Sequence, residues 1–130
     1  TRLSDEFVEM ARPRADLHQA TVLDFGARVD EGPLEQLARS LLATRGEAVL
    51  DEACLMARLA ALRLPADHAM LLRPLVGLAQ PPEHARLHAA MTPETRTRRR
   101  VTALRELILA RAIHRPQLLL VEDLHWADET

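Results

Sequence analysis

Lysine is absent from this sequence, and cysteine, glycine and aromatic residues are scarce. All 17 basic residues are arginine, and the one cysteine is Cys54. A single cysteine excludes an internal disulfide framework and favours a reducing compartment, so we expect a cytoplasmic protein. The absence of lysine excludes a phosphate-binding loop of the form GxxxxGK[ST] within these residues, because that loop requires its lysine. The glycines, at Gly26, Gly32, Gly46 and Gly77, do not match its spacing.

Long apolar runs and a strong charge of one sign are missing as well. No stretch approaches the roughly 18 apolar residues of a membrane span, so we expect neither a membrane segment nor a signal peptide. The net charge is −2, with 48% apolar and 28% charged residues, which is a balance typical of a globular domain. Because no basic excess marks the chain as a whole, we expect no direct nucleic-acid binding by it.

The most informative stretch is 118–123, where four apolar residues run directly into Glu122 and Asp123. An apolar run without alternation is typical of a strand buried on both faces of a parallel sheet. Ligands of such sheets bind at the carboxyl ends of the strands, where this run places its two carboxylates. One carboxylate there can hold Mg²⁺, and its neighbour can orient or activate a water.

Residues 118–128, LLLVEDLHWAD, resemble the Walker B segment of the bacterial regulatory ATPases of the STAND class. These modules are attached to nucleotide cyclases, Ser/Thr kinases or LuxR-type transcription regulators. The helix and proline that lead into the strand, from Thr97 in TRRRVTALRELILARAIHRPQLLLVED, are similar to that family too. The resemblance implies an α/β fold of the ASCE P-loop NTPase type, helix-rich, with ATP and Mg²⁺ as cofactors.

The first three residues, Thr1, Arg2 and Leu3, resemble the end of the family's phosphate-binding loop, GKTRL. The resemblance then implies that residues 1–130 form a partial P-loop domain. This part would extend from just after the loop lysine through the Walker B strand at 118–123. Other parts of the domain would lie before and after it.

The resemblance also assigns roles to individual residues. Thr1 and Glu122 would be Mg²⁺ ligands, through a hydroxyl and a carboxylate. Glu122 and Asp123 would be the catalytic carboxylates, with Asp123 orienting the attacking water. The nucleotide contacts would come from Thr1, Arg2 and His125, the last of which could sense the γ-phosphate.

Periodicity and breaker residues predict the remaining elements. A helix is expected over the first ten residues, with Leu3, Phe7 and Met10 at helical spacing. A second strand is expected at 21–28, parallel to and beside the strand from Leu118. Further helices are expected from Pro33, at 47–64, and in short pieces between the prolines after Leu64. A last helix is expected from Thr92 to about Ile113, with Val101, Leu104, Ile108 and Ala112 along one face and Leu107 beside it.

Three other features carry weaker signals. His84 and His88 are one helical turn apart, as in some zinc sites, but no accompanying ligands suggest a metal, and exposed histidines are the favoured interpretation. Arginines at 96 and 98–100 could contact phosphates, but a solvated helix face or an interdomain contact is favoured. Cys54 stands among apolar residues, which favours a buried, inert thiol.

Three functions remain open at this point. The first is a signalling switch in which ATP binding and slow hydrolysis control an effector domain in the same chain, with a homo-oligomer allowed by the resemblance. The second is a degenerate helical module that binds partner proteins without nucleotide chemistry. The third is a helical scaffold in which the acid pair has no function. Of these three functions, we expect the first.

Overall fold

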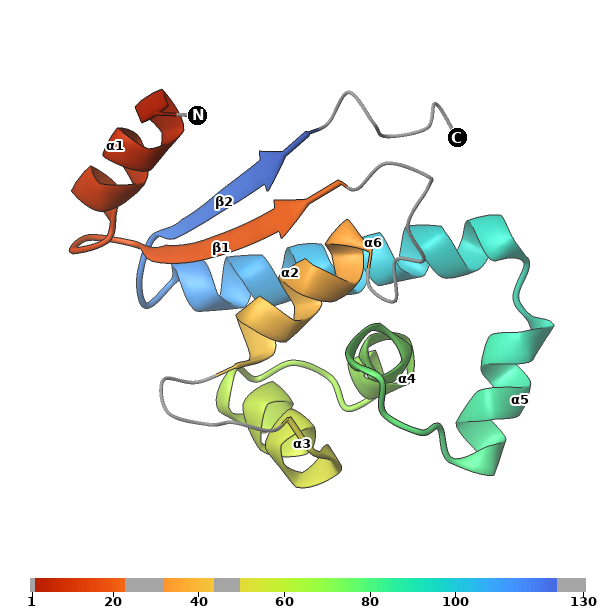
Figure 1. The fold of residues 1–130 in the computed structure, drawn as a ribbon. Coiled ribbons are helices and arrows are strands. Elements are labelled where there is room, and N and C mark those ends of the chain that lie inside the picture. The colour runs from red at the N-terminus through yellow and green to blue at the C-terminus, as the bar shows by residue number, and fades with distance from the viewer. Residues whose placement is uncertain (1, 23–31, 44–49, 124–130) are drawn as a thin grey trace.

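A computed structural model of the chain describes residues 2–22, 32–43 and 50–123. In these residues one strand lies near each end of the sequence, and the elements between the two strands are helices (Figure 1). In order they are α1 (Arg2–Ala11), β1 (Asp16–Thr21), α2 (Pro33–Leu42), α3 (Glu52–Ala61), α4 (His68–Leu72), the 3-10 helix η1 (Arg73–Val76), α5 (Pro82–Ala90), α6 (Pro93–Ala112) and β2 (Gln117–Glu122). The fold is therefore α/β and helix-rich.

Within the described residues the sheet consists of β1 and β2, which are parallel neighbours. The register pairs Asp16 with Gln117 at one end and Thr21 with Glu122 at the other. All helices from α2 to α6 lie between the two strands in sequence, as a crossover connection of parallel strands requires. The predicted parallel pairing is thereby confirmed.

The position predicted for the first of these strands was wrong. β1 begins at Asp16 rather than Thr21, and Val22 already follows it. The remainder of the predicted strand, 23–28, lies outside the described residues. The sequence of β1, DLHQAT, is mostly polar, and its burial depends on hydrogen bonds to residues far away in the chain, described below.

The main core lies among the helices. Helices α2 and α6 run beneath the strands, and α3 and α4 lie below them (Figure 1). Leu41 of α2, Leu55 of α3, Leu72 of α4 and Leu107 of α6 are all completely buried in one cluster. Each such side chain contributes roughly 1.5–3 kcal/mol by leaving water. This cluster fixes the helices on which the strands rest.

Helix α3 is shorter than the predicted helix at 47–64. Asp51 begins it by accepting a hydrogen bond from the backbone N–H of Cys54 at 2.8 Å, which is a typical N-cap. Arg63, with a φ of 55°, lies just beyond its end at Ala61. Helix α2, from Pro33, and α6, which starts after the N-cap Thr92, confirm their predicted starts.

The buried face of α6 agrees only in part with the predicted face. Leu104 and Leu107 are buried as expected and Ile108 is half-buried, but Ala103 is buried as well, whereas Val101 and Ala112 are exposed. Helix α1 likewise buries only Val8. Its predicted apolar face is exposed, because α1 stands apart from the other helices (Figure 1). That face consists of Leu3 (78% exposed), Phe7 (57%) and Met10 (77%).

No helix in the described parts of the chain has both the length and the apolarity that crossing a bilayer requires.

Candidate functional site

The two carboxylates predicted to carry the chemistry follow one another at the carboxyl end of β2. Glu122 is the last residue of the strand, is half-buried, and accepts a hydrogen bond from the N–H of Val22 through its carbonyl oxygen at 3.0 Å. Asp123 comes directly after the strand and is exposed. Both therefore lie at the sheet edge where parallel α/β folds bind their ligands.

Asp123 has a left-handed backbone conformation, with a φ of 60°. Aspartate tolerates this region better than most residues, but it still costs about 1 kcal/mol relative to an extended backbone. Asp123 adopts this conformation at the point where β2 ends. Strained residues of this kind concentrate at binding and catalytic sites.

Of the other three predicted site residues, the structure describes only Arg2. Thr1 and His125 lie outside the described residues. Arg2 begins α1, and its side chain is 95% exposed and pairs with Glu6 at 3.3 Å. The described part of the predicted site is therefore the pair Glu122 and Asp123.

These two carboxylates fit a magnesium ion better than a transition metal. Mg²⁺ prefers oxygen ligands and is commonly held by one or two carboxylates, with waters and phosphate oxygens completing the shell. The described residues contain no group of three or more His, Cys, Asp or Glu side chains arranged to hold a metal. A site at Glu122 would thus need further ligands from a nucleotide and water, or from residues such as Thr1.

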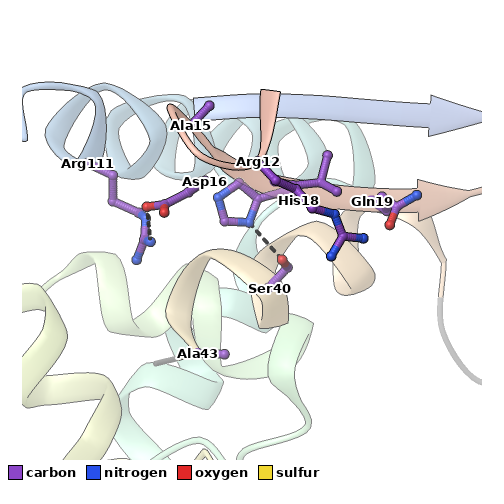
Figure 2. Close-up of a pocket in the computed structure, with 9 residues that line it drawn as sticks. Arg12, Ala15, Asp16, His18, Gln19, Ser40, Ala43 and Arg111 are labelled. Atoms are coloured by element: carbon purple, nitrogen blue, oxygen red, sulfur yellow. Dashed lines mark hydrogen bonds and ion pairs between the residues drawn. The ribbon is translucent and has the colours of Figure 1, made fainter. Parts of the chain in front are cut away.

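A second polar site, which the sequence did not indicate, lies at the opposite edge of the sheet (Figure 2). It is a cavity of about 490 Å³ lined by residues of β1, α2 and α6 and of the turn between α1 and β1, including His18, Ser40 and Arg111. His18 is buried, and its ring joins two elements. Its Nδ1 lies 2.7 Å from the hydroxyl of Ser40 on α2, and its Nε2 lies 2.9 Å from Oε1 of Gln117 on β2.

The hydrogen bonds of Gln117 determine the tautomer of His18. Oε1 of Gln117 also accepts a hydrogen bond from Nε of Arg111 at 3.1 Å, so this oxygen is an acceptor. The Nε2 of His18 must therefore carry the proton and donate it, which leaves Nδ1 to accept from the Ser40 hydroxyl. Burial lowers the pKa of His18, and the nearby Arg111 adds to this effect, so the ring is neutral at pH 7.

Asp16 holds the two arginines that surround this site. Its carboxylate accepts from Nη2 of Arg111 at 3.1 Å and pairs with Arg115 at 3.2 Å. Burial acts to raise the pKa of Asp16, but the hydrogen bonds from Gln117 and Arg111 and the charges of both arginines lower it overall. Arg111 also donates to the backbone oxygen of Leu41 at 2.9 Å. The cluster ties β1, β2, α2 and α6 together and is a structural device.

No short-range pattern could have revealed this cluster. His18 and Ser40 are 22 residues apart, and His18 and Gln117 are 99 residues apart. A histidine in a polar stretch such as DLHQAT looks solvated until its partners are known. The cluster is also the reason that so polar a segment forms a strand.

His84 and His88, the pair one turn apart, are half-buried and bound to arginines. Nδ1 of His84 lies 2.9 Å from Nη1 of Arg73, and Nε2 of His88 lies 3.3 Å from Nη2 of Arg100. The two histidines are therefore not the exposed side chains expected on a polar helix, because each contacts an arginine. Cys54 is half-buried, less than expected, and lines a surface cavity beside α3.

Comparison of the chain with protein-family models, with curated proteins and with solved structures found no match. The function proposed below is therefore inferred from the residues of the chain and from where the fold places them.

Proposed function

We propose that this chain is the Mg²⁺–ATP-binding segment of a signal-transducing regulatory ATPase, whose nucleotide state switches an attached effector domain. The observation that carries the proposal is the position of Glu122 and Asp123. They are consecutive carboxylates at the carboxyl end of a strand that has a parallel neighbour, joined to it by a helical crossover. The resemblance of residues 118–128 to the Walker B segment of such ATPases supports the same function.

In this proposal Glu122 supplies the carboxylate for the Mg²⁺ shell. Its half-buried position at the end of β2 favours a single fixed orientation of the carboxylate. Asp123, one residue further and exposed, accepts a hydrogen bond from the attacking water and orients it. The bound ion neutralises the charge that develops on the phosphates. Thr1 adds a hydroxyl ligand, and Arg2 and His125 contact the phosphates.

The proposal also predicts what residues 1–130 do without a phosphate-binding loop. The loop amides and lysine supply most of the contacts to the β- and γ-phosphates in P-loop proteins. Residues 1–130 by themselves should therefore bind ATP weakly and should not hydrolyse it. Calorimetry that found micromolar ATP binding by these residues alone would contradict this part of the proposal.

The experiment uses the protein expressed with the residues that its gene encodes before Thr1. ATP affinity and turnover are measured for the wild type, for Glu122→Gln and for Asp123→Asn. We expect Glu122→Gln to weaken Mg²⁺-dependent ATP binding at least about tenfold, because a charged ligand is lost. Asp123→Asn should lower turnover more than affinity, because its role is in the reaction step.

Glu83→Gln is the matched control, because Glu83 is an exposed carboxylate in the first turn of α5. It should leave both affinity and turnover unchanged. If Glu122→Gln and Asp123→Asn behave like this control, the proposed nucleotide site is wrong. The chain would then be better described as a helical module that binds partner proteins.

A further inference from the structure

The positive charge of the chain is concentrated in one segment. Residues 84–105, from within α5 to beyond the middle of α6, contain six arginines and one carboxylate, Glu94, although Glu83 and Glu106 border this segment and the whole chain has a net charge of −2. The arginines are Arg86, Arg96, Arg98, Arg99, Arg100 and Arg105. Helix α5 and the start of α6 lie at one end of the molecule, at the right of Figure 1. The overall acidic balance therefore hides a strongly basic surface.

Most of these arginines lack an acidic partner. The side chains of Arg86, Arg98, Arg99 and Arg105 are exposed, and in the described parts of the chain none of them lies within 4.0 Å of a carboxylate oxygen. Some arginines elsewhere are paired, as Arg73 is with Glu52 at 2.6 Å. Like charges held together without counter-charges repel one another, so an acidic ligand on this surface is favoured.

His88, a residue of α5, is influenced by the positive charges of the same arginines. Partial burial lowers the pKa of His88, and the positive charges of Arg100 and Arg96 lower it further. His88 thus remains neutral at pH 7 and adds no charge to the surface. The local field is strong enough to affect a neighbouring titratable group.

A cleft with an apolar lining opens beside these arginines. Its volume is about 370 Å³, and it lies between α4, α5 and α6. Met70, Leu71 and Leu87 supply its apolar part, while Arg99 and two histidines supply most of its polar part. Leu87 is 57% exposed. The cleft also contains one carboxylate, that of Asp67.

We propose that this basic cleft is a docking site for an acidic, amphipathic segment of a partner protein. An apolar side chain of the segment packs on Leu87, Met70 and Leu71, and its carboxylates pair with Arg99 and with the exposed arginines Arg86 and Arg98. Arginine suits this role because its planar guanidinium binds carboxylates with two parallel hydrogen bonds. The combination of one apolar anchor and a charged rim is typical of peptide-binding surfaces.

The composition of the site favours a protein over a nucleic acid. The chain has only three aromatic residues, Phe7, Phe25 and Trp126, and none of them lies in α4, α5 or α6. Without an aromatic platform the surface cannot stack bases, as surfaces that bind single strands usually do. An apolar floor likewise gives no contact to a phosphate backbone. An acidic peptide with leucines uses both features of the cleft.

The experiment measures binding of a labelled synthetic peptide in which leucines recur every three or four residues among glutamates. Fluorescence anisotropy with the full chain gives its affinity. Arg99→Glu should weaken binding by about tenfold or more, because it replaces an attraction by a repulsion. Leu87→Ser should weaken it by about fivefold, and a peptide with serines in place of its leucines should lose a similar factor.

Two variants separate a local contact from a general effect. Arg14→Glu makes the same charge change in the turn between α1 and β1, at the opposite end of the molecule (Figure 1), and should leave binding within about twofold. Arg99→Gln removes the charge without adding a repulsion and should cost less than Arg99→Glu. Circular dichroism melting curves establish that each variant is folded, and Arg99→Gln provides the comparison if Arg99→Glu is not.

Three results would overturn the inference. Equal losses for Arg14→Glu and Arg99→Glu would mean that only the overall charge matters. Equal binding of the leucine and serine peptides would mean that the cleft contributes nothing. Tighter binding of a single-stranded RNA oligonucleotide, in competition with the peptide, would assign the surface to phosphates instead.

Discussion

Replacing His18 by a residue that does not titrate should make the stability of the fold less dependent on pH. The ring is buried and neutral, and its pKa is lowered from an ordinary value near 6.5, chiefly by burial. In the unfolded chain the ring is free to take up a proton as the pH falls through that value. The unfolded state then binds more protons than the folded state, so the free energy of unfolding decreases with decreasing pH.

The size of this effect has an upper limit. If the folded ring takes up no proton down to pH 5.5, protonation of the unfolded chain lowers the free energy of unfolding by about 1.4 kcal/mol between pH 7.5 and 5.5. The loss ends once the pH passes below the lowered pKa of the folded ring. Carboxylates with ordinary values of 3.8 to 4.5, such as Asp16 and Glu52, titrate mainly below this window.

The assay is urea unfolding of the wild type and of His18→Gln at pH 7.5, 6.5 and 5.5. Glutamine keeps a polar side chain between Ser40 and Gln117 but does not titrate. His18→Gln should be less stable at pH 7.5, since a buried hydrogen bond is worth about 1 kcal/mol. Its stability should also fall less with pH. His88→Gln, measured in parallel, accounts for the other histidine with a lowered pKa. Equal pH dependence of His18→Gln and the wild type would refute the reasoning.

Four further substitutions test the packing, a helix cap and an ion pair. Leu107→Ala should cost about 2–5 kcal/mol of unfolding free energy, because Leu107 is completely buried, whereas Leu109→Ala, on the exposed side of α6, should cost about 0.5 kcal/mol or less in the same urea titration. Thr92→Ala removes the N-cap of α6 and should cost about 1 kcal/mol, visible as a lower thermal midpoint. Glu52→Gln leaves the buried Arg73 without its carboxylate and should cost about 1.5–3 kcal/mol, so unchanged stability would show that solvent replaces Glu52.

The parts of the fold with strong local signals were predictable from the sequence. The four apolar residues before Glu122 predicted β2, and the N-cap Thr92 followed by a proline predicted the start of α6. The candidate carboxylates Glu122 and Asp123 followed from the same stretch. Such signals work because they depend on near neighbours in the chain.

The parts that depend on distant residues were not predictable. β1 was placed too late, because His18 becomes a buried strand residue only through Ser40 and Gln117. The buried face of α6 was predicted only in part, because Val101 has the right spacing but is 49% exposed. Periodicity gives a candidate face, and only the neighbouring elements decide which part of it is buried.

The basic cleft illustrates the same limit for function. The arginines at 96 and 98–100 were visible in the sequence, but the acidic total suggested a solvated face. Only the fold shows that Leu87 and Met70 form an apolar cleft next to Arg99. Overall net charge is therefore a poor guide to the charge of a particular surface.

The most direct test of the central claim is whether Glu122 binds the metal of a metal–nucleotide complex. Mn²⁺ can replace Mg²⁺ at an oxygen site and is visible by electron paramagnetic resonance. With ATP and the protein extended before Thr1, the wild type should bind Mn²⁺ in a nucleotide-dependent manner. Glu122→Gln should weaken this binding at least about tenfold, and Glu83→Gln should not. Equal Mn²⁺ binding by all three proteins would contradict the account.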